Sequence, residues 1–126
     1  MACPVAMIAI FLCGIAASVS AELDRDAKAE KRFKQLLIRL RGGHDREAEE
    51  SLLTMMKRSE LRRIPKNLGA TLYHTALDNL AMHPSSLEAK DFVVQIGRWH
   101  LARSKGIKKA TDHDLRQDIF ARCRGR

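Results

Sequence analysis

The histidines and cysteines of this 126-residue chain are the side chains best suited to bind a metal ion or to attack a substrate. The five histidines are His44, His74, His83, His100 and His113. No two of them are four residues apart, which is the spacing that places two imidazole ligands on one helix face, and the chain has no Cys-x-x-Cys pair. His113 lies between Asp112 and Asp114, where acidic residues that begin a helix account for the cluster. The sequence therefore predicts no metal site.

Cys123 is the cysteine that lies outside the apolar N-terminal region, which contains Cys3 and Cys13. One thiol cannot form an intramolecular disulfide. Its spacing from Leu115 and Ile119 places it on an apolar helix face, which predicts a buried small hydrophobic side chain rather than a nucleophile. The chain also has no glycine-rich phosphate loop in the required context. The sequence predicts that the protein is not an enzyme, with no catalytic residue, no cofactor and no small-molecule substrate.

The elements that position these side chains are predicted to be helices. Four apolar residues with the spacing i, i+3, i+4 and i+7 form one stripe, and a glycine pair at 42–43 ends this first amphipathic helix. They are Phe33, Leu36, Leu37 and Leu40. Later boundaries are marked by Asp45 as an N-cap, by Pro65 as a break, and by Ser85 with Glu88 and Thr111 with Asp114 as capping boxes.

These signals predict an all-α fold. A single apolar or transmembrane helix at the N-terminus is followed by a small bundle of four to five short helices, with a helical hairpin at 67–104. We divide the chain into a transmembrane anchor or signal peptide at 1–21, a basic juxtamembrane helix at 22–43 and a helical domain at 44–126.

The N-terminal segment, residues 4–21, carries no charged side chain. As a helix it would be roughly 27 Å long, close to the thickness of the hydrocarbon core of a bilayer. The small residues before Glu22 resemble a signal-peptide cleavage site after Ala21, although a basic N-terminal region is missing. Seven basic residues follow within 22–41 and none precedes the segment, which favours an uncleaved single-pass anchor with the C-terminal domain in the cytoplasm. The alternative is a secreted or periplasmic protein, cleaved at Ala21.

Basic side chains dominate the chain, which has a formal net charge of +8. Such a balance favours anionic partners, namely lipid headgroups, nucleic acid or acidic proteins. Eight basic residues are candidates for a phosphate-binding surface: Arg62, Arg63, Lys66, Arg98, Arg103, Lys105, Lys108 and Lys109. Trp99 beside His100 is expected at the edge of the core rather than stacked on a base. The charge is dispersed along the chain, so nucleic-acid binding stays an alternative.

Residues 73–100 are similar in form to a tetratricopeptide helix pair, but the landmarks are about three residues too far apart and no second copy occurs. Residues 70–123 more closely resemble a helical module of bacterial, often membrane-associated, proteins. The matching residues are Ala76, Leu77, Leu80, Pro84, Ser86, Glu88, Ile96, Gly97, Arg98, Leu115, Asp118, Ile119, Ala121 and Cys123. Ile96 replaces the usual leucine, and Trp99-His100 replaces a pair of the alanine-tyrosine type. The resemblance implies a bacterial source and no activity.

Gly97 lies in the middle of a predicted helix, where glycine costs about 1 kcal/mol relative to alanine. Such a glycine is tolerated where another helix packs closely. The sequence therefore predicts that Gly97 marks the point where its helix crosses the preceding or the following one.

Charge placement leads to the functional prediction. Lys28, Lys31, Arg32 and Lys34 follow the apolar segment directly and are expected to contact anionic lipid. We expect a small membrane-anchored basic protein that works as a non-catalytic binding module, with another protein as its partner. The alternatives are an exported basic helical protein and a cytoplasm-facing nucleic-acid binder.

Overall fold

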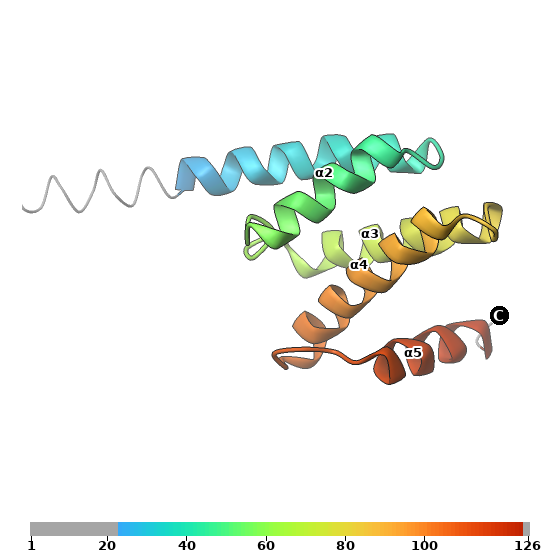
Figure 1. Cartoon of the computed structure of the whole chain (residues 1–126). Coiled ribbons are helices and arrows are strands. Elements are labelled where there is room, and N and C mark those ends of the chain that lie inside the picture. Colours follow the sequence, from blue (N-terminus) through green and yellow to red (C-terminus); the bar gives the residue numbers. More distant parts are fainter. Residues whose placement is uncertain (1–22, 125–126) are drawn as a thin grey trace, which may run out of the picture.

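The computed structural model describes residues 23–124, and every regular element among them is a helix (Figure 1). The helices are an N-terminal helix over 23–41, α2 (Arg46–Lys57), α3 (Lys66–Met82), α4 (Leu87–Lys105) and α5 (Asp112–Arg124). Successive helices reverse direction along the chain (Figure 1). The prediction of an all-α fold with four to five short helices is confirmed for this part of the chain.

The apolar segment at 4–21, with the anchor or signal peptide predicted over 1–21, lies outside the described residues. Over 23–124, no helix combines the length and the apolar character needed to cross a bilayer. The transmembrane helix of the predicted fold is therefore not found among residues 23–124.

The N-terminal helix packs through its predicted apolar stripe. Phe33 and Leu40 are fully buried, and they belong to the same core cluster as Leu52 of α2 and Leu72 of α3. The Asn79 side chain donates a hydrogen bond of 3.1 Å to the Leu40 carbonyl oxygen, which ties the end of this helix to α3. The described part of the juxtamembrane helix that was predicted over 22–43 thus shares one core with residues 44–124.

Capping side chains set the helix starts, largely as predicted. Asp45 Oδ1 accepts a hydrogen bond of 3.1 Å from the Ala48 amide at the start of α2. Before α5, the Thr111 amide donates to Asp114 Oδ2 at 2.9 Å, and the Asp114 amide donates to Thr111 Oγ1 at 3.2 Å. This reciprocal pair is a complete capping box and confirms the predicted start of α5.

Helices α3 and α4 form the predicted hairpin, but its second helix starts one residue later than the sequence indicated. The N-cap of α4 is Ser86, whose Oγ accepts from the Ala89 amide at 3.2 Å. The prediction of Ser85 as the cap was wrong because the Ser86 amide donates to the His83 carbonyl oxygen and closes the turn first. The chain can enter helical geometry only after that turn.

Helix α5 corrects the prediction made for Cys123, which is exposed rather than buried. Residues spaced by four drift by about 40° per step around a helix, so Cys123 is rotated by about 80° from Leu115. The face that packs on the core instead has the spacing i, i+3, i+4 and i+7, and it includes two polar residues. Its members are Leu115, Asp118, Ile119 and Arg122, all buried or partly buried.

Candidate functional site

The four residues predicted to contact lipid lie on the exposed side of the N-terminal helix, away from the buried Phe33 stripe. Lys28 Nζ lies 3.2 Å from Asp24 Oδ2, and Lys34 Nζ lies 3.6 Å from Glu30 Oε1. Both are solvent-exposed pairs one turn apart, which contribute little to stability and exchange easily for other anions. Lys31 and Arg32 are exposed as well. The structure therefore presents these cations to the surroundings.

A second basic surface is an open groove of about 450 Å³ between α2, α4 and the loop that follows α4. We call it the Trp99 groove. Its apolar lining includes Met56, Trp99, Ala102 and Ile107, and its basic lining consists of Arg98, Arg103, Lys108 and Lys109. No carboxylate lines it. A smaller hollow of about 240 Å³ shares Met56, Trp99 and Arg103 and extends the groove toward Arg62.

Trp99 is held in place from two sides. The guanidinium carbon of Arg103 lies 4.8 Å from the indole centroid, a cation–π contact. A Cβ atom added at Gly69 of α3 would lie 3.4 Å from the far edge of the same ring. Arg103 also donates to the Ile64 carbonyl oxygen, and burial lowers the pKa of its guanidinium. The indole is therefore a fixed, half-buried wall of the groove.

Arg98 fixes the loop that carries the two groove lysines. Its Nε donates to the Ala110 carbonyl oxygen at 2.9 Å, and its Nη1 lies 3.5 Å from Asp112 Oδ1. Gly106 caps α4 in the left-handed conformation at φ 66°, and the Ile107 amide donates to the Ala102 carbonyl oxygen at 3.0 Å. The loop is thus folded back against α4, with Lys108 and Lys109 exposed.

The predicted phosphate-binding residues separate into two groups. Five of the eight line the groove or its extension: Arg62, Arg98, Arg103, Lys108 and Lys109. Arg63 instead pairs with Asp26 of the N-terminal helix at 3.0 Å, and Lys105 lies 3.8 Å from Asp114. Lys66 is exposed at the start of α3. Met56 and Ile107 could not be recognised as groove residues from the sequence, because they line the groove from another helix and from a loop.

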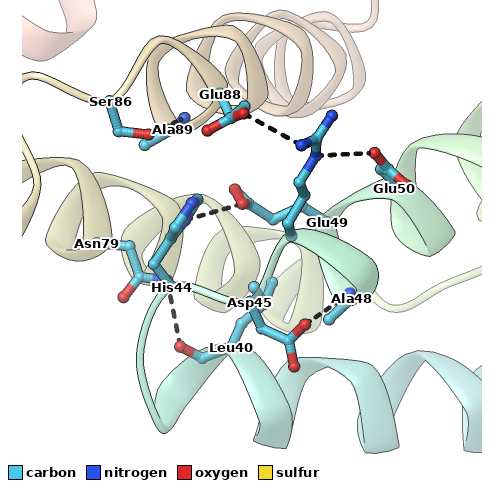
Figure 2. A network of polar contacts seen from close by, with 11 residues as sticks. Leu40, His44, Asp45, Ala48, Glu49, Glu50, Asn79, Ser86, Glu88 and Ala89 are labelled. Carbon is cyan, nitrogen blue, oxygen red and sulfur yellow. Dashed lines mark hydrogen bonds and ion pairs between the residues drawn. The ribbon is translucent and has the colours of Figure 1, made fainter.

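A polar network joins α2 to its neighbours (Figure 2). Glu49 is only 4% exposed, and its Oε1 lies 2.9 Å from His44 Nδ1. The two groups are not oriented for a hydrogen bond with each other. Among residues 23–124, neither His44 Nδ1 nor Glu49 Oε1 has another hydrogen-bond partner. Burial, followed by the nearby carboxylates of Glu88 and Asp45, raises the pKa of Glu49 to about 7. The sequence did not single out Glu49, because its burial depends on how α2 packs on its neighbours.

A second polar cluster fastens α5 to α3. The Tyr73 hydroxyl donates to Asp118 Oδ2 at 2.8 Å, and Arg122 Nε donates to the same oxygen at 2.7 Å. Burial alone would raise the pKa of Asp118, but the hydrogen bonds from Arg122 and Tyr73 outweigh it and lower that pKa. Arg122 also lies over the Tyr73 ring. Since Tyr73 is fully buried, this cluster joins α3 and α5 from inside the domain.

Gly97 lies between α3 and α5. A Cβ atom added to it would be 2.5 Å from Leu115 Cδ1 and 3.0 Å from Tyr73 Cε1. Its lack of a side chain therefore lets α4 approach a residue from each of the two neighbouring helices. The backbone at Gly97 is covered by protein side chains.

Gly97→Ala is expected to lower the free energy of unfolding by about 1–2 kcal/mol, because the overpacking exceeds the gain in helix propensity. In a Leu115→Ala background the same change should be neutral or stabilising, since the nearest obstructing atom is gone. Urea unfolding of the four proteins measures this coupling. Gly69→Ala is the matched control, because its Cβ meets neighbours only at 3.4 Å. Equal effects at Gly69 and Gly97 would contradict the close approach at Gly97.

No protein-family model, curated protein or solved structure matches this chain. Among residues 23–124, no group of three or more His, Cys, Asp and Glu side chains is arranged to hold a metal ion. The described residues offer two basic surfaces for binding, which are the exposed side of the N-terminal helix and the Trp99 groove.

Proposed function

We propose that this protein is a small, non-catalytic binding module that works at a membrane surface. Residues 1–21 anchor it with the described domain in the cytoplasm, anionic lipid orients it, and another protein is its partner. The observation that carries this proposal is the N-terminal helix, which presents cations on one side while its other side is buried in the core.

That packing gives the basic side chains a fixed direction. Because Phe33 and Leu40 are fully buried, Lys28 and Lys31 move with the whole domain rather than on a flexible tether. Basic residues near an anionic leaflet contribute about 1 kcal/mol each. The four lipid-contact residues together would then be enough to hold the N-terminal helix against the membrane and leave the Trp99 groove to bind a protein.

Vesicle binding tests the lipid part of the proposal. The chain without residues 1–21 is expected to sediment with phosphatidylglycerol-containing vesicles at low salt and to be released by high salt, because screening weakens exposed charge contacts. Lys28→Glu with Lys31→Glu should reduce this binding at least about tenfold. Failure of the unaltered protein to bind anionic vesicles would overturn this part of the proposal.

The matched control is Lys108→Glu with Lys109→Glu, which makes the same change in charge on the loop between α4 and α5. Helices α2, α3 and α4 separate this loop from the N-terminal helix (Figure 1). Vesicle binding by the control variant should stay within about twofold of the unaltered protein. An equal loss in both variants would mean that net charge alone, and not the N-terminal helix, attracts the lipid.

The exported alternative makes a different prediction about the N-terminus. N-terminal sequencing of protein purified from cells separates the two: a chain that begins at Glu22 has been cleaved, whereas a chain that keeps residues 1–21 is anchored.

A further inference from the structure

We propose that the Trp99 groove binds an acidic, amphipathic segment of a partner protein. This inference rests on the proposed function as a binding module and names the chemistry of the partner. The combination of an apolar floor with a rim of cations, and without any carboxylate, is complementary to a segment that carries apolar side chains on one face and Glu or Asp beside them.

The floor of the groove suits side chains of a protein. Met56 of α2 and Ile107 of the loop after α4 line the groove together with Trp99, and Ile107 is 44% exposed although it is a large apolar residue. Methionine adapts its shape to different apolar partners, and tryptophan and arginine are the residues most often found at the energetic centre of protein interfaces. The volume of about 450 Å³ and the open form fit a few side chains of a segment rather than an enclosed small molecule.

The rim is preorganised for carboxylates. Arg98 holds the loop through the Ala110 carbonyl oxygen, so Lys108 and Lys109 stay beside the groove before any partner arrives. Groups already in position lose less conformational entropy on binding. Arg103 is fixed by its contacts with Trp99 and Ile64, so it contributes positive potential to the groove without moving.

Single-stranded nucleic acid fits the same rim less well. Binding of single strands relies on aromatic rings with an open face on which bases stack. Here Arg103 already covers one face of the Trp99 ring, and the far edge of the ring packs on Gly69. The rest of the floor is aliphatic. These observations favour an amphipathic protein segment over a nucleic-acid strand.

Trp99 is the single tryptophan of the chain, so its fluorescence reports on this groove alone. The experiment uses the full chain in a zwitterionic detergent and a tryptophan-free helical peptide of about four turns, with Leu on one face and Glu on the other. We expect this peptide to shift Trp99 emission to shorter wavelength. A peptide with Lys in place of Glu should not do so, and an oligoglutamate should bind at least about tenfold more weakly because it leaves the apolar floor unfilled.

Charge reversal then locates the binding. Lys108→Glu with Lys109→Glu should weaken peptide binding at least about tenfold, whereas Lys28→Glu with Lys31→Glu should leave it within about twofold. Ile107→Ser should remove most of the preference for the amphipathic peptide over oligoglutamate. These variants change exposed residues, and circular dichroism checks that each one is folded.

Three results would overturn the proposal. One is an unchanged Trp99 emission at peptide concentrations up to about 1 mM. Another is equal affinity for oligoglutamate, which would mean that charge alone attracts the ligand. The last is tighter binding of an oligothymidylate with quenching of Trp99, which would assign the groove to nucleic acid. Vesicle binding through the N-terminal helix is measured separately, so failure of the groove is distinguishable from failure of the membrane proposal.

Discussion

Replacing Phe33 by alanine is expected to lower the free energy of unfolding by about 3–5 kcal/mol. Phe33 is fully buried, with a relative accessibility of 0%. It lies in one cluster with Leu52, Leu72 and Ile96 from three other helices. Truncation would leave a cavity among side chains that relax only partly. Denaturant unfolding followed by far-UV circular dichroism measures the loss.

The matched control is Ile38→Ala, which removes a large apolar side chain from the same helix at a position that is 67% exposed. Its effect should stay within about 0.5 kcal/mol. Because a small domain is stable by only about 5–15 kcal/mol, Phe33→Ala can fall below the limit of folding. Phe33→Leu keeps most of the volume and should cost no more than about 1.5 kcal/mol, so the series stays measurable.

The Phe33 series decides whether the basic helix is an independent juxtamembrane element. If the N-terminal helix were only a tether, Phe33→Ala and Ile38→Ala would have the same small effect. A large difference between the two means that the cations on its outer side are rigidly joined to the Trp99 groove. Membrane contact at one surface would then set the orientation of the other.

Replacing Glu49 by glutamine is expected to make the protein more stable at pH 8, by up to about 3 kcal/mol, and to change little near pH 4.5. The pKa of Glu49 is raised in the folded protein from 4.5 to about 7, mainly by burial and then by Glu88 and Asp45. The folded state therefore holds its proton more tightly than the unfolded state. Stability from this group is complete below pH 4.5 and is lost as the pH rises through about 7.

Glutamine has the shape of the protonated acid and does not ionise. The Glu49→Gln variant therefore does not lose stability at this position as the pH rises. The measured quantity is the difference in unfolding free energy between variant and unaltered protein at several pH values. Contributions from Asp114 and Asp118, whose pKa values are lowered, act at acid pH in both proteins and cancel in the difference. Glu50→Gln on the exposed side of α2 is the control, and its difference should not follow this pH course.

His44 and Glu88 lie near the Glu49 carboxylate. His44 Nδ1 lies 2.9 Å from the Glu49 carboxylate, and Glu88 of α4 is itself paired with Arg46 at 3.5 Å (Figure 2). If an imidazolium at His44 stabilised the ionised carboxylate fully, Glu49→Gln would instead destabilise the protein most near neutral pH. That result would contradict the raised pKa of Glu49 and make the pair a buried salt bridge.

The sequence by itself determined the local architecture. The Phe33 stripe, the Asp45 cap and the Thr111 capping box were all predicted correctly, because helix faces and caps depend on residues no more than about four positions apart. The mid-helix position of Gly97 also indicated a close approach, since glycine is unfavourable there without one. The positive charge that favours anionic partners is likewise a property of the sequence alone.

The tertiary structure decided the exposure of Cys123, the burial of Glu49 and the formation of the Trp99 groove, because all three depend on which segments meet in the folded domain. Cys123 is exposed because α5 packs through a face that includes Asp118 and Arg122. Those two polar residues are held in the interface by Tyr73 and His74 of α3. Glu49 is buried because the loop before α2 and helix α4 close around it. The Trp99 groove exists only where α2, α4 and a folded-back loop meet. Local patterns carry no information about such meetings, because the free energy that selects them comes from burial across the whole domain.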